Sequence, residues 1–94
     1  MKREDIKECD VLLLRNGNVR IVLYNEVYCE LTTFMKDMWC EHSLMNYTSD
    51  FKYEKDNSYD IVEVYRYSTI RNAMSCVVHN EIVHSTRTCL YKEV

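Results

Sequence analysis

Residues 59–66, Tyr-Asp-Ile-Val-Glu-Val-Tyr-Arg, show the clearest pattern of hydrophobic positions in the chain. The segment is rich in β-branched and aromatic residues, contains neither Gly nor Pro, and follows the turn-like run 55–58. These features predict a strand. Ile61, Val62 and Val64 are apolar at positions on both sides of that strand, so we expect it to lie centrally in a sheet and to be covered on both faces.

The first part of the chain predicts three further strands. Residues 9–15 are apolar on both faces, and residues 19–24 and 27–34 alternate in polarity. Asn16-Gly17 lies between the first two of these segments and is the strongest short-range hairpin signal, because a two-residue turn needs positive φ at both positions.

The second part predicts one helix near residues 69–80 and a last strand over 86–94. Five apolar residues follow the i, i+3, i+4, i+7, i+8 spacing of one helix face, namely Ile70, Ala73, Met74, Val77 and Val78. Residues 35–46 fit either a short helix or a loop that lies over one end of the sheet.

These elements predict a single β-rich domain over residues 1–94, mostly β and of the α+β class. A small sheet with two apolar faces must curl on itself or be covered. We therefore expect an SH3-like barrel of four to six bent antiparallel strands with one helix. An exposed edge strand leaves a homodimer open as an alternative to a monomer.

Composition narrows the classes of partner. The formal net charge of −3 and the dispersed Lys and Arg residues argue against nucleic acid, which needs a concentrated basic face. A single Gly excludes Gly-rich phosphate-binding loops. The charged N-terminus is unlike a signal peptide and no apolar run is long enough to span a bilayer, so we expect no membrane partner and a cytoplasmic location.

The five cysteines have no C-x-x-C spacing, which is typical of reduced thiols packed as small apolar groups. Zinc favours thiolates and imidazoles, but the spacing of the nearest candidates matches no standard zinc module; these are Cys76, His79, His84 and Cys89. Whether they bind metal stays open, and we expect no metal site, no cofactor and no catalytic residue. We do not expect an enzyme, because nothing unites a Cys, a His and a third group.

Two sets of side chains are candidates for recognition. Met and Trp in one irregular segment suit an adaptable protein-binding surface, although they equally suit a loop that plugs the end of a barrel. The predicted partner-binding residues are Phe34, Met35, Met38, Trp39, Met45 and Tyr47. A tyrosine-lined groove with arginines facing phosphate is the alternative, although tyrosines also fill half-buried sheet faces. Its predicted ligand-binding residues are Tyr24, Tyr65, Tyr67, Arg20, Arg66 and Arg71.

Three pieces of the sequence together resemble a group of small proteins carried by phages and prophages of low-GC Gram-positive bacteria. They are Glu4-Asp5-Ile6-Lys7 followed by Asp10-Val11; Leu14-Arg15-Asn16-Gly17 followed by Ile21-Val22-Leu23; and Leu44, Tyr47, Asp50 and Phe51 leading into residues 59–66. The resemblance implies a small β-rich domain without a catalytic motif, and residues 34–40 and 74–84 depart from it. Many short phage proteins act stoichiometrically, and anti-CRISPR and other anti-defence inhibitors are examples. We therefore expect a protein that binds and inhibits a host-defence protein in the bacterial cytoplasm; the alternative is a binder that sequesters a small ligand or nucleotide.

Overall fold

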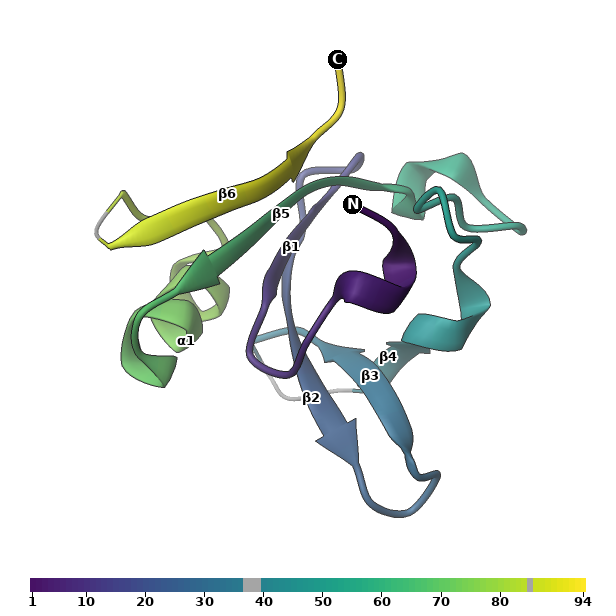
Figure 1. Ribbon diagram of the computed structural model, residues 1–94, viewed down its shortest axis with the longest axis horizontal. Helices are drawn as coiled ribbons and strands as arrows, with labels where there is room; N and C mark the ends of the chain where they lie inside the picture. The colour runs from purple at the N-terminus through teal and green to yellow at the C-terminus, as the bar shows by residue number, and fades with distance from the viewer. Residues whose placement is uncertain (37–39, 85) are drawn as a thin grey trace.

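The computed structural model, which describes residues 1–36, 40–84 and 86–94, consists of one antiparallel sheet, one α-helix and the irregular segments that connect them (Figure 1). The strands are β1 (Val11–Leu14), β2 (Val19–Asn25), β3 (Glu30–Phe34), β4 (Cys40–Ser43), β5 (Ile61–Tyr67) and β6 (Arg87–Lys92). The helix is α1 (Ile70–His79), and three short 3-10 turns are η1 (Arg3–Asp5), η2 (Leu44–Asn46) and η3 (Asn57–Tyr59). The expected β-rich α+β fold, its helix and its strand number are confirmed.

The six strands lie in the order β4-β3-β2-β1-β5-β6, and every neighbouring pair is antiparallel. β4 and β6 are therefore the two edges, and the closure into a barrel that the sequence led us to expect does not occur. Closure is unnecessary because separate parts of the chain cover each face. We call the face covered by α1 the outer face, and the face that curls round the N-terminal turn the inner face (Figure 1).

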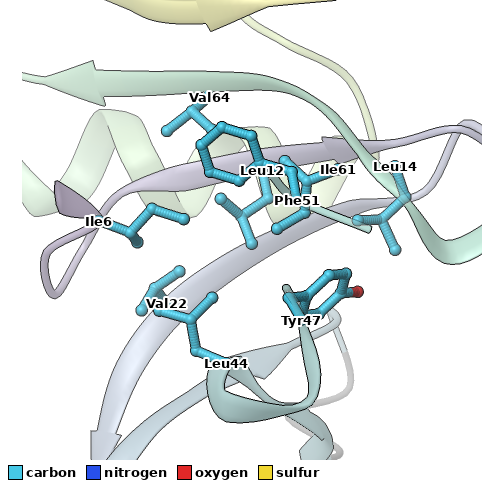
Figure 2. Close-up of a cluster of buried hydrophobic side chains, with 9 residues drawn as sticks. All are labelled: Ile6, Leu12, Leu14, Val22, Leu44, Tyr47, Phe51, Ile61 and Val64. Carbon is cyan, nitrogen blue, oxygen red and sulfur yellow. The ribbon is translucent and has the colours of Figure 1, made fainter. Parts of the chain in front are cut away.

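Strands β1, β2 and β5 contribute side chains to a core on each face. In β1, Leu12 packs in the inner core and Val11 in the outer core; in β5, Val64 and Tyr65 divide in the same way. The predicted burial of residues 59–66 on both faces is thus confirmed for β5. Figure 2 shows the inner core, in which side chains from the irregular segment 44–51 meet those of the sheet.

The hairpin between β1 and β2 is confirmed, but its turn differs from the expected one. Gly17 has φ of 89°, whereas Asn16 is not among the residues with positive φ. Leu14 N donates to Asn18 O at 2.9 Å and Gly17 N donates to Leu14 O at 2.9 Å. The loop therefore has three residues, 15–17, ending in a left-handed glycine, which is the next most common hairpin connection.

Side-chain caps determine where α1 begins and ends. Thr69 Oγ1 accepts a hydrogen bond from Asn72 N at 3.2 Å, and Asn80 ends the helix in the left-handed conformation. The Asn80 side chain also accepts from Val19 N at 2.8 Å, so the helix end is tied to the first residue of β2. These contacts hold α1 against the outer face.

A buried ion pair joins the loop before β1 to β5. The Asp10 carboxylate is buried and accepts hydrogen bonds of 2.8 Å from both Arg66 Nε and Arg66 Nη2, and a third of 2.9 Å from Lys7 N. This bidentate geometry is the strongest form of ion pair between side chains. Arg66 is thereby committed to an internal contact.

We expect Arg66→Ala to lower the free energy of unfolding by about 2–4 kcal/mol, because it leaves the Asp10 carboxylate buried without its charged partner. Urea denaturation measures the change. Arg71→Ala, at an exposed position of α1, is the matched control and should change stability by less than about 0.5 kcal/mol. Equal effects of the two substitutions would contradict a stabilising role for the ion pair.

Arg15 forms a second bidentate pair, with Glu93, at 2.9 and 2.7 Å, and this contact holds the pKa of Glu93 below its usual range. A carboxylate with a lowered pKa adds stability above its ordinary pKa of about 4.3, and that stability is lost as the pH falls through the lowered value. We expect Glu93→Gln to destabilise the protein at pH 7 and to make little difference at pH 2.5. Urea titrations at both pH values test this, and a difference that persists at pH 2.5 would contradict it.

Candidate functional site

A groove of about 350 Å³ opens on the inner face between η1, the β2–β3 hairpin and η2. Ile6 and Leu44 are buried and Leu31 is half-buried, so these three apolar side chains form the floor. Tyr24 and Met45 line the groove and remain 48% and 63% exposed. The groove is therefore apolar at its base, and Arg3, Glu4 and Glu30 add charged groups to its sides.

The pairing of β2 with β3 creates one wall of this groove. Tyr24 pairs with Leu31 of β3 and lies on the same face of the sheet as the buried Val22. The hairpin projects beyond the rest of the molecule at this end (Figure 1). The opposite wall is η1, which Arg3 holds in place. The Arg3 guanidinium donates to Tyr47 O and to Glu4 Oε1, and Arg3 N donates to Ser49 O at 3.1 Å.

The tip of the β2–β3 hairpin is an ordered turn that displays two apolar side chains. Val27 is 83% exposed and Tyr28 is 68% exposed. Asn25 Oδ1 accepts hydrogen bonds from Val27 N at 3.0 Å and from Tyr28 N at 3.3 Å, and Cys29 has a positive φ of 53° that returns the chain to β3. These local contacts restrict the turn before any partner is bound.

Tyr24 and Met45 line the groove, and Val27 and Tyr28 are exposed at the tip of the hairpin that forms one of its walls; we call these four exposed large hydrophobic side chains the hairpin patch. Glu4 and Glu30 line the adjoining groove and carry negative charge at its border. An exposed apolar cluster with a polar rim, beside a preformed groove, is typical of a surface that contacts another protein.

Arg20 occupies the inner face farther along β2 and is only 1% exposed. Its Nη1 lies 2.7 Å from His42 Nδ1, to which it donates, and 3.3 Å from Thr33 Oγ1. The guanidinium carbon is 5.6 Å from the centre of the Tyr59 ring, and the His42 ring is 4.5 Å from that of Tyr53. The Arg20 guanidinium is therefore surrounded by aromatic rings and polar atoms of the protein, and a ligand from solvent cannot reach it.

The predicted partner-binding residues are distributed over several places. Met45 lies in the groove, and Met38 and Trp39 lie outside the described residues. Phe34 is half-buried against the outer core, and Met35 is half-buried beside a second hollow of about 210 Å³ near the end of α1. Tyr47 is buried, its hydroxyl donates to Tyr59 O at 3.0 Å, and burial raises the pKa of Tyr47 above its ordinary value.

The residues predicted for the alternative, a ligand site, are not brought together either. Tyr24 lines the groove on the inner face, whereas Tyr65 and Tyr67 pack in the outer core. Arg71 is exposed on α1, and the two remaining arginines, Arg20 and Arg66, make the internal contacts described above.

Sequence reasoning missed the two tip residues, Val27 and Tyr28. The alternating pattern led us to place them at the start of a strand over 27–34, but β3 begins only at Glu30. Asn25 was the available signal, because its side chain favours a turn that includes the two residues after it.

Among the described residues, no group of three or more His, Cys, Asp and Glu side chains is arranged to hold a metal ion. Of the four residues considered for zinc, Cys76 is buried, and His79, His84 and Cys89 are exposed. Within the described ranges, no helix has the length and hydrophobicity to cross a membrane.

We expect Asn25→Ala to loosen the hairpin tip, because it removes the acceptor for both tip N–H groups. Amide hydrogen exchange at Val27 and Tyr28 should become faster, while the global free energy of unfolding falls by about 1 kcal/mol or less. Asn57→Ala is a control at an exposed residue of η3. Unchanged exchange at the tip in Asn25→Ala would show that its side chain does not order the turn.

Comparison of the chain with models of protein families, with curated proteins and with solved structures finds no match in any of the three. The groove and the hairpin patch are therefore the observations from which a function can be argued.

Proposed function

We propose that this protein binds another protein through the groove and the hairpin patch, and that it acts stoichiometrically without catalysing a reaction. The observation that carries the proposal is that Tyr24, Val27 and Tyr28 are exposed on the projecting β2–β3 hairpin, and that Met45 is exposed in the groove beside it. Exposed Tyr residues are favoured anchors at protein interfaces, because they combine a large apolar area with a polar hydroxyl.

The energy available from this surface supports a specific contact. A tyrosine side chain buries roughly 150–250 Å² when it is fully covered. With 48% of Tyr24 and 68% of Tyr28 exposed, covering each ring contributes roughly 2–4 kcal/mol at about 25 cal/mol per Å². The ordered turn at Asn25 lowers the entropy that binding would otherwise cost.

The class of partner is proposed from the sequence resemblance to small phage and prophage proteins of low-GC Gram-positive bacteria. On that basis the partner is a host-defence protein, and the protein acts as an anti-CRISPR or other anti-defence inhibitor in the bacterial cytoplasm. The residues that carry the resemblance, such as Asn16-Gly17 and Ile61 to Val64, build the hairpin and the core. Tyr24, Val27, Tyr28 and Met45 lie outside those motifs, whereas Glu4, Ile6 and Leu44, which line the groove, belong to them.

We expect the double substitution Tyr24→Ser and Tyr28→Ser to reduce partner capture by at least about tenfold, because it removes the two aromatic anchors without entering the core. Affinity capture from a lysate of a low-GC Gram-positive host, with quantitative mass spectrometry, measures the loss. The partner retained by the wild type should be a component of a defence system.

The matched control is Ile70→Ser with Val78→Ser, which removes two similarly exposed apolar side chains from α1 on the opposite face. Urea denaturation establishes that both double variants are folded. Loss of capture with the α1 variant and retention with the hairpin variant would place the interface on the outer face. Trp39→Ala in the same series tests the anchor predicted from the sequence. Absence of any specific partner would contradict the proposed function.

A further inference from the structure

We infer that the groove takes a short segment of the partner in which an apolar side chain lies between Lys or Arg residues. The inference rests on the proposed function and adds the chemistry of what is bound.

The floor of the groove accepts an apolar group. The floor is formed by Ile6, Leu31 and Leu44. These side chains are hydrocarbons and offer no hydrogen bond to a ligand. A volume of about 350 Å³ is near the lower limit for pockets that hold small molecules. Such a space suits one bulky side chain of a segment that lies across the groove.

The border of the groove is acidic. Residues 21–35 of the hairpin contain two carboxylates, Glu26 and Glu30, and no Lys or Arg. Glu30 lines the groove, Glu26 is exposed at the tip, and within the described ranges neither of them forms an ion pair.

The cations near the groove do not offset this negative charge. Arg3 is the one basic residue among the lining residues, and its guanidinium is engaged by Tyr47 O and by the carboxylate of Glu4. Lys7 and Glu8, both exposed on the next loop, balance each other in charge.

The two features define complementary roles for the residues of the bound segment. The apolar side chain supplies affinity by leaving water, and flanking Lys or Arg residues supply orientation and selectivity against acidic segments. Because Glu26 is exposed and Glu30 only half-buried, the ionic contribution should weaken with added salt.

A random dodecapeptide library displayed on phage and selected against the immobilised full-length protein tests the inference. We expect the selected peptides to carry an apolar residue flanked by Lys or Arg. Fluorescence anisotropy with the synthetic peptides should show about 30-fold weaker binding to Tyr24→Ser and about 3-fold to 5-fold weaker binding to Glu30→Gln. The matched carboxylate control, Glu81→Gln at the far end of α1, should bind as the wild type does.

Selected peptides without basic residues, bound equally by Glu30→Gln, would overturn the inference and leave the proposed function standing. Failure to select any peptide that loses binding with Tyr24→Ser would overturn it as well, since the groove would not accept a short segment. A concentration-dependent dimer that is abolished by Tyr24→Ser would show that a second copy occupies the groove, and this result would also overturn it. The lysate capture described above independently decides whether a partner protein exists.

Discussion

The structure depends on one constraint, which is that β1, β2 and β5 carry apolar side chains on both faces. Leu12 and Val64 need cover on the inner face, while Val11 and Tyr65 need it on the outer face. A helix of ten residues is enough for the outer face, because Thr69 and Asn80 hold its two ends. The inner face is covered by η1 and the irregular segment 44–51. The peptide groups of these segments are not paired in the sheet, so they need other hydrogen-bond partners. The bonds from Arg3 N to Ser49 O and from Tyr53 N to Asp60 Oδ1 meet that need.

The groove follows from where this inner cover ends. η1 and η2 line the groove together with the pair Tyr24–Leu31, and beyond this pair β2 and β3 continue to the tip. On the inner face, Leu31 is half-buried against the core and Tyr24 stays 48% exposed.

Most of the expected strands and the helix agree with the structure to within a few residues, whereas the expected closure of the sheet does not. The strand at 61–67 and the helix at 70–79 follow from periodicity within a few residues. Whether the sheet closes into a barrel depends on which distant segments cover its faces. The hydrophobic periodicity of a single segment contains no information on these contacts. The sequence predicts Arg20 as an arginine of the alternative ligand site, but its register opposite Leu12 turns it into the inner face, where it is buried. Met45 is predicted as a partner-binding residue and Tyr24 as a residue of the alternative ligand site, and both line the groove; Tyr28 falls within the strand predicted over 27–34.

The distribution of arginines also determines the character of the surface. Arg20 is enclosed by rings, Arg66 pairs with the buried Asp10, Arg15 pairs with Glu93, and Arg3 holds η1. The fold uses these cations for internal contacts, so they present little positive charge to a partner. The hairpin, by contrast, keeps its two carboxylates outside any ion pair in the described residues. Under the proposed function, these two carboxylates favour a basic, apolar segment of the partner over an acidic one.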